Sequence, residues 1–270
     1  MKTSNPVLAR LGQAAERERA AGYAPVGQYG QPGYDAPYPT TDYPAAPPTV
    51  RPMTVDDVVI KTVALLGITG ISAAAAWALI PDSMALVACI GALVVGLVLG
   101  LIISFSRMAN PALVVAYAVV EGVFVGMVSK AFESLYDGIV LQAVTATFGV
   151  FFLMAILYKI RAIRATPRFI RGVVAAMAGL FAVMLINLVL AMFDINTGLR
   201  DGSPLAIGFS LVCIVVAALS FILSFHEVEE GVRMGLPQRY SWVAAFGILV
   251  SLIWLYLEML RLISFFQGDD

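Results

Sequence analysis

Four ionisable residues interrupt the apolar runs of this chain and are its clearest candidates for chemistry. Charged side chains are costly inside a bilayer, and they are retained where they pair, face water or carry ions and protons. Each of the four lies inside or at the end of a stretch long enough to cross a bilayer. They are Glu121, Asp194, His226 and Glu258. We therefore expect an ion path or a pH sensor at these positions.

Glu121 falls near the centre of the third apolar run, between Val120 and Gly122. An ionised carboxylate at that depth costs several kcal/mol unless it meets water or a cation. Its side chain is therefore expected to face the interior of the helix bundle. Three interpretations stay open: a protonated carboxyl, an ion pair with a cation such as Lys61 or Arg107, or a ligand in a cation path.

Glu258 and Asp194 each have a simpler structural interpretation beside the functional one. Arg261 follows Glu258 by three residues, so the two can pair on one helical face near the membrane surface. Asp194 comes just before Asn196-Thr197-Gly198, which is typical of a turn at a helix end. Both carboxylates remain candidates for an ion path.

His226 is the only histidine, and it opens an acidic cluster at the end of the sixth apolar run. An imidazole beside carboxylates titrates near neutral pH and can gate a path by changing its charge. The carboxylates can also raise the local concentration of Ca²⁺ or protons. The Ca²⁺ candidates are Glu227, Glu229 and Glu230. The alternative is a solvated polar loop after the span.

The elements that must position these residues are seven apolar helices. Hydrophobic residues make up 60% of the chain, which is more than soluble domains contain, and charged residues make up 13%, which is less. Turn residues such as Asp82-Ser83 and helix starts at Pro111 and Pro204 separate the runs. The predicted spans are 58–80, 84–105, 111–130, 139–158, 170–193, 205–225 and 240–266.

The fold class is therefore all-α and integral to the membrane, with one membrane domain over residues 55–270. Three helices, three helices and a seventh would form two units of opposite membrane orientation, because each unit has an odd number of crossings. Small residues at Gly96 and Gly100, and at Gly122 and Gly126, allow close approach between helices.

Lysine and arginine in the short loops place the N-terminus in the cytoplasm. Ten of these cations fall on the predicted cytoplasmic face and three on the other, which is the expected bias of an inner-membrane protein. Residues 1–54 form a tail rich in proline and tyrosine that is expected to be disordered and cytoplasmic. Seven crossings would put the C-terminus outside, but a shallow last helix leaves its side open.

Several function classes are excluded by missing residues. A single histidine does not supply a zinc hydrolase or an intramembrane serine protease, and the seventh span has no lysine for retinal. The sequence has no glycine-rich phosphate-binding loop, which excludes a nucleotide-driven pump within this chain. It also has no surface pattern of basic and aromatic residues of the kind that binds nucleic acid. We expect no enzymatic activity and no cofactor.

Two regions of the chain resemble the bacterial branch of the Bax-inhibitor family. One comprises the stretch from Phe225 to Trp242, which contains Gly235-Leu236-Pro237-Gln238-Arg239-Tyr240-Ser241-Trp242, together with Ala245-Phe246-Gly247 and the stretch from Trp254 to Leu262. The other comprises Thr3-Ser4-Asn5-Pro6-Val7-Leu8 and Met53-Thr54-Val55-Asp56-Asp57-Val58. The resemblance implies seven helices with the last surrounded by the other six, and a passive, pH-dependent Ca²⁺ leak in some members.

The resemblance also implies a pH sensor, which in relatives consists of two aspartates that share a proton. One of them lies late in the sixth helix and the other in the seventh. Here the first position falls at His226 or Ser224, and the second at Ser251 or Glu258. Neither choice gives an aspartate pair. His226 and Glu258 would lie roughly 20–30 Å apart along the helices, so Ser251 is the easier partner.

We therefore predict a slow, pH-sensitive cation leak, with Glu121 lining the path and His226 near the cytoplasmic gate. The alternative is a non-conducting regulator that binds other membrane proteins, such as a membrane protease, through the tail and cytoplasmic loops. The expected partners are the lipid bilayer with Ca²⁺ or H⁺, or those proteins.

Overall fold

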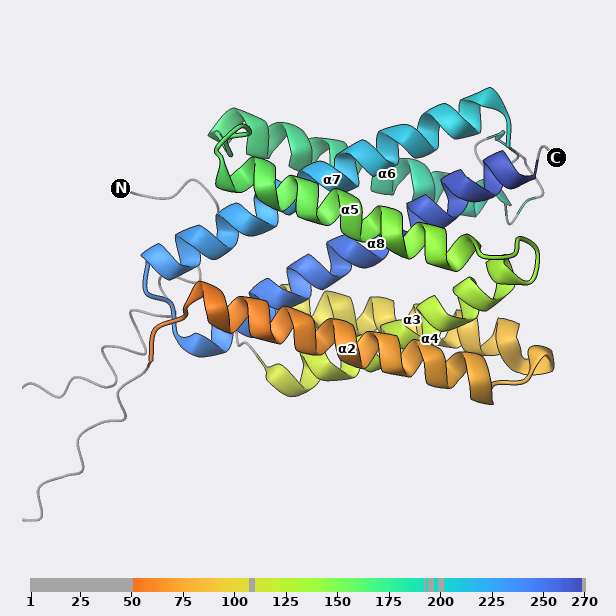
Figure 1. The fold of residues 1–270 in the computed structure, drawn as a ribbon, viewed down its shortest axis with the longest axis horizontal. Coiled ribbons are helices and arrows are strands. Elements are labelled where there is room, and N and C mark those ends of the chain that lie inside the picture. Colours follow the sequence, from red (N-terminus) through yellow and green to blue (C-terminus); the bar gives the residue numbers. More distant parts are fainter. Residues whose placement is uncertain (1–50, 107–109, 192, 194–196, 199–201, 269–270) are drawn as a thin grey trace, which may run out of the picture.

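The computed structural model describes residues 51–268 except 107–109, 192, 194–196 and 199–201 (Figure 1). This part of the chain holds seven helices long and apolar enough to span a membrane, as the sequence predicts. They are α2 (Val55–Leu79), α3 (Asp82–Phe105), α4 (Pro111–Glu133), α5 (Ile139–Lys159), α6 (Pro167–Ala191), α7 (Pro204–Arg233) and α8 (Ser241–Gln267). The predicted tail lies outside the described residues up to position 50, and Asp194 does too.

Local capping chemistry sets where these helices begin. Thr54 and Asp57 form a capping box at the start of α2, each satisfying the other's backbone N–H. Asn110 caps α4 and Ser203 caps α7, and each cap is followed by a proline in the first helical turn. Pro111 and Pro204 therefore start helices, as the sequence indicates.

The helices form two three-helix layers with α8 between them. Figure 1 shows α2, α3 and α4 on one side of the bundle, α5, α6 and α7 on the other, and α8 running diagonally between the layers. The last helix contacts α2 and α4 from the first layer and α5 and α7 from the second. The predicted arrangement of two units around a central seventh helix is confirmed.

Hydrophobic clusters on both sides of α8 explain its central place. Phe246 and Leu249 pack in a cluster with Leu65 and Tyr117 of the first layer. Leu252 and Leu255, together with Phe221 of the second layer, belong to the other cluster. Because α8 is apolar around most of its circumference, burial on both sides is its favourable position.

Two glycines let α2 and α4 approach closely. A Cβ on Gly122 would lie 2.5 Å from the carbonyl oxygen of Thr69, and one on Gly126 would lie 2.5 Å from that of Ala73. No side chain fits at such distances. The small residues that the sequence singles out in this helix are therefore a backbone contact surface.

The sixth span is longer than the sequence indicates. Helix α7 continues through Arg233, so His226 and the acidic cluster lie on a helix instead of in a loop. Its 30 residues give a length of about 45 Å, which exceeds the roughly 30 Å hydrocarbon core. The added turns still pack on the bundle, because Val228 belongs to the hydrophobic cluster around α8 and Val232 packs against it.

Candidate functional site

A buried carboxylate on the central helix is the first element of the candidate site. Glu258 of α8 is 1% exposed, although it lies well inside the last span. Arg261 donates from Nη1 to both carboxylate oxygens of Glu258, at 3.2 and 3.1 Å. Ser210 of α7 donates to the same carboxylate at 3.3 Å. The predicted Glu258–Arg261 pair is present, and its carboxylate is buried between helices of the protein.

A second buried polar contact joins the same two helices. The hydroxyl groups of Ser220 on α7 and Ser251 on α8 lie 3.1 Å apart, and Ser220 also donates to the carbonyl of Ala217. Ser251 precedes Glu258 by seven residues, which is two helical turns or about 10 Å on the same face of α8. We name the set Ser210, Ser220, Ser251, Glu258 and Arg261 the α7–α8 seam.

The seam is closed in this structure. Ser210, Ser220, Ser251 and Glu258 are each buried, and only Arg261 reaches partial exposure. The carboxylate is an oxygen ligand of the kind that hard cations prefer, and the hydroxyls are further oxygen atoms beside it. If α8 moved away from α7, these groups would line the opening.

The positions suggested by the family resemblance find other partners. Ser251 bonds to Ser220, one turn before the Ser224 that the sequence indicates. Ser224 donates to the carbonyl of Ser220 within its own helix. His226 is half-buried and makes no hydrogen bond or ion pair within the described part of the chain. The structure therefore joins Ser251 and Glu258 to serines of α7 and does not bring His226 to either.

Glu121 lies in the first layer, away from the seam. Its carboxylate faces α3, where a Cβ on Gly96 would lie 2.8 Å from Oε2. Tyr117, one turn earlier, is within hydrogen-bonding reach. The ring of Tyr117 also meets Phe246 of α8 edge-on, with ring centroids 4.9 Å apart. Glu121 is thus half-buried at mid-membrane and linked to the central helix through one tyrosine.

No cation of the described residues pairs with Glu121. Of the two partners considered from the sequence, Arg107 lies outside the described residues and Lys61 is engaged elsewhere. The ion pair with Lys61 is therefore not formed, and a pair with Arg107, a protonated carboxyl and an ion-path ligand stay open for Glu121.

The acidic cluster after His226 is divided between separate contacts. Glu229 accepts a hydrogen bond from Tyr158 of α5, and Glu230 pairs with Arg233 at 2.7 Å. Glu227 is exposed. Within the described ranges, no three His, Cys, Asp or Glu residues gather closely enough to hold a metal ion.

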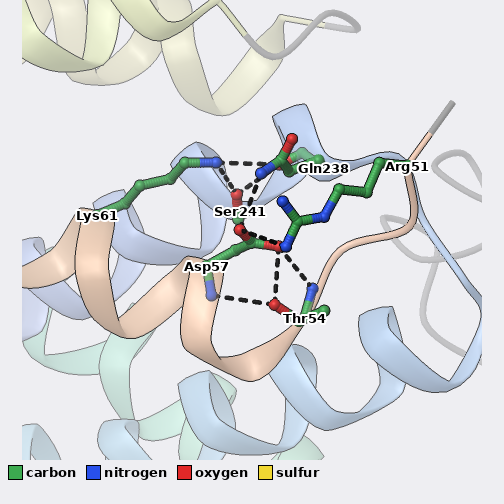
Figure 2. Close-up of polar contacts among 6 residues, drawn as sticks. All are labelled: Arg51, Thr54, Asp57, Lys61, Gln238 and Ser241. Atoms are coloured by element: carbon green, nitrogen blue, oxygen red, sulfur yellow. Dashed lines mark hydrogen bonds and ion pairs between the residues drawn. The ribbon is translucent and has the colours of Figure 1, made fainter.

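A polar clasp, which the sequence did not predict, ties the start of α2 to the start of α8. Figure 2 shows Asp57 at its centre, accepting from Gln238 Nε2 at 2.8 Å and from Thr54, with Arg51 at 3.7 Å. Lys61 donates to the Gln238 carbonyl at 3.2 Å and to the Ser241 hydroxyl. We name these six residues the clasp: Arg51, Thr54, Asp57, Lys61, Gln238 and Ser241.

Backbone hydrogen bonds reinforce the clasp. The N–H of Met53 donates to the carbonyl of Leu236 at 2.7 Å, and that of Gln238 donates to the carbonyl of Arg51 at 2.9 Å. These contacts join the two segments on which the family resemblance rests, Met53–Val58 and Gly235–Trp242. The signal that could have found the clasp is the clustering of polar residues at two span starts on the same predicted face.

The fold and these polar contacts define the protein as a multipass, all-helical membrane protein with ionisable groups buried around a central helix. A family model described as Bax inhibitor 1 like matches residues 5–268, which is nearly the whole chain. The chain therefore belongs to this family. No curated protein matches it. Its place in the bacterial branch stays a prediction from the sequence.

Proposed function

We propose that the protein is a passive, pH-sensitive leak for cations, with Ca²⁺ as the principal ion. The observation that carries this proposal is the α7–α8 seam, in which a carboxylate 1% exposed lies on the central helix beside hydroxyl groups of the next helix. Ionisable groups inside a membrane span are rare and costly, and they commonly mark ion or proton pathways.

In this proposal the structure corresponds to the closed state. Arg261 occupies the carboxylate of Glu258, so a cation does not bind there until the pair separates. Movement of α8 away from α7 would expose Ser210 and Ser251 as further oxygen ligands. A change in the protonation of Glu258 or of His226 would alter the charge along the proposed path, which supports a pH-sensitive flux.

Glu121 takes a second role as a ligand at mid-membrane in the first layer. Its lack of a cationic partner in the described residues supports this role, and its contact with Tyr117 connects it to Phe246 of α8. We place the starts of α2 and α8 in the cytoplasm, because cationic residues dominate that end of the bundle. His226 near the end of α7 then lies toward the cytoplasmic gate.

The test is Ca²⁺ flux into liposomes that hold the purified full chain, at pH 6 and pH 8. We expect wild-type flux above empty liposomes that differs between the two pH values. Glu258→Gln and Glu121→Gln should each reduce it at least about tenfold, a loss of about 1.4 kcal/mol in ion stabilisation. His226→Ala should flatten the difference between pH 6 and pH 8.

Asp137→Asn provides the matched control, because Asp137 is an exposed carboxylate in the turn between α4 and α5. Its flux should equal that of the wild type. Wild-type liposomes that leak no more than empty ones would refute the proposal, and the non-conducting regulator would become the better hypothesis. Flux that all three site variants retain would refute the assignment of the path.

A further inference from the structure

A run of exposed cations lies where α5 turns into α6. Five lysine and arginine residues fall within thirteen positions, and the same stretch contains no aspartate or glutamate. All five are exposed, and no ion pair involves them in the part of the chain that the structure describes. They are Lys159, Arg161, Arg164, Arg168 and Arg171. We name this set the α5–α6 cationic cluster.

Apolar residues between the cations fix the turn to the bundle. Ile163, Ala165 and Phe169 are partly buried against the hydrophobic cluster of the second layer. The intervening arginines consequently remain exposed. Arg161 adopts a φ of 57°, a conformation that favours glycine, at the end of α5. The packing of these apolar residues thus fixes the position of the cationic cluster on the bundle.

Two glutamates near the end of α7 are engaged with other groups. Glu229 accepts a hydrogen bond from Tyr158, and Glu230 pairs with Arg233. Ion pairs within the described residues therefore do not neutralise the positive charge of the turn. This charge is available to attract an anionic ligand.

An apolar stripe on α6 continues directly from the cluster. Val174 is 51% exposed, Phe181 61% and Leu185 50%. They follow Arg171 at successive spacings of three, seven and four residues, which places them on one helical face. Helix α6 packs mainly against α7, so this face is open to the lipid. A cationic group at the end of a lipid-facing stripe matches the two parts of a phospholipid.

We propose that the α5–α6 cationic cluster and the exposed stripe of α6 form a binding site for an anionic phospholipid. The arginines bind the phosphate and the anionic headgroup, and the acyl chains lie along the stripe. Clusters of four to eight cations beside a membrane span are the usual recognition element for such lipids, and arginine offers phosphate a paired geometry. The site does not depend on the proposed conductance.

The test compares phosphatidylglycerol with phosphatidylcholine of the same acyl chains, titrated onto the purified full chain in detergent and measured by native mass spectrometry. Wild type should bind phosphatidylglycerol about tenfold more tightly than phosphatidylcholine. Each cation near an anionic surface contributes about a fivefold gain, so this preference needs only one or two effective contacts. The variant R161Q/R164Q/R168Q/R171Q should lose this preference. Equal affinities for the two lipids in the wild type would overturn the proposal.

Three further variants separate lipid binding from effects on folding. Arginine-to-lysine changes at the same four positions keep the charge but lose the paired geometry of the guanidinium. Because the charge supplies most of the attraction, they should retain a preference within about threefold of the wild type. The double variant R168Q/R171Q leaves three cations in the turn and should still weaken phosphatidylglycerol binding several-fold. The control Arg233→Gln removes a cation that pairs with Glu230 and should leave the preference unchanged. A double variant with wild-type preference would also overturn the site.

Discussion

Two ion pairs with the same spacing allow the effect of burial to be measured within one protein. Glu258 and Arg261 lie three residues apart on α8, with side chains 1% and 21% exposed. Glu230 and Arg233 have the same spacing on α7, with side chains 14% and 71% exposed. The exposed pair has the shorter contact, 2.7 Å against 3.1 Å. Distance alone therefore predicts a stronger exposed pair, and burial predicts the opposite.

The expected magnitudes follow from what each substitution leaves behind. Arg261→Met removes the cation from a carboxylate that water scarcely reaches, and it should cost about 3 kcal/mol, the low end for a broken buried pair. Glu258→Gln keeps the shape and leaves Arg261 with partial access to water, so it should cost about 1.5 kcal/mol. The double variant has no charge left to bury and should cost about 2.5 kcal/mol. These values give a coupling of about 2 kcal/mol.

The assay is unfolding of the purified protein in mixed micelles by increasing fractions of dodecyl sulfate, followed by helix content. The matching cycle with Glu230→Gln and Arg233→Met should give a coupling below about 0.5 kcal/mol. The reasoning fails if the coupling at Glu258–Arg261 is no larger than that at Glu230–Arg233. Strict additivity at the buried pair would show that the two groups do not depend on each other.

Two further predictions concern the helix contacts. Gly126→Ala should lower the free energy of unfolding by about 1–3 kcal/mol, because the added Cβ meets the Ala73 carbonyl. In the control Gly149→Ala the added Cβ meets no atom within 4 Å, so the free energy of unfolding should not fall. Equal effects of the two changes would contradict the close contact between α2 and α4. Asp57→Asn should speed amide hydrogen exchange at the starts of both α2 and α8, because Asp57 bonds to Gln238 across the clasp. The control Asp56→Asn changes an exposed neighbouring carboxylate and should leave exchange unchanged. Faster exchange in α2 alone would mean that the clasp does not connect the two helices.

The sequence predicts the fold well because hydrophobic length and helix caps are local signals. Seven runs of sufficient length gave the seven spans, and Pro111 and Pro204 marked the starts of two helices. The end of α7 was less predictable. The residues from His226 to Glu230 are polar enough to read as a loop, yet they extend the helix because Glu229 and Val228 find partners on the bundle.

The candidate site was only partly predictable, because its contacts join residues far apart in the chain. The Glu258–Arg261 pair lies within one helical turn and was expected from spacing. Ser210 and Ser220 gave no signal of their own, since a serine in an apolar helix often bonds to its own backbone. Which serine meets Ser251 depends on how α7 is rotated and shifted against α8, and that register is a property of packing.

The clasp and the seam together make α8 an element with defined positions. Hydrophobic packing against both layers is non-directional and tolerates small shifts of the helix. The hydrogen bonds at Ser241 and at Glu258 are directional, and these residues lie seventeen positions apart, about 25 Å along α8. A shift by one residue rotates the helix by about 100° and would break both sets of contacts at once. The central helix therefore keeps its register or leaves it as a whole, and the proposed leak would require this behaviour of its gate.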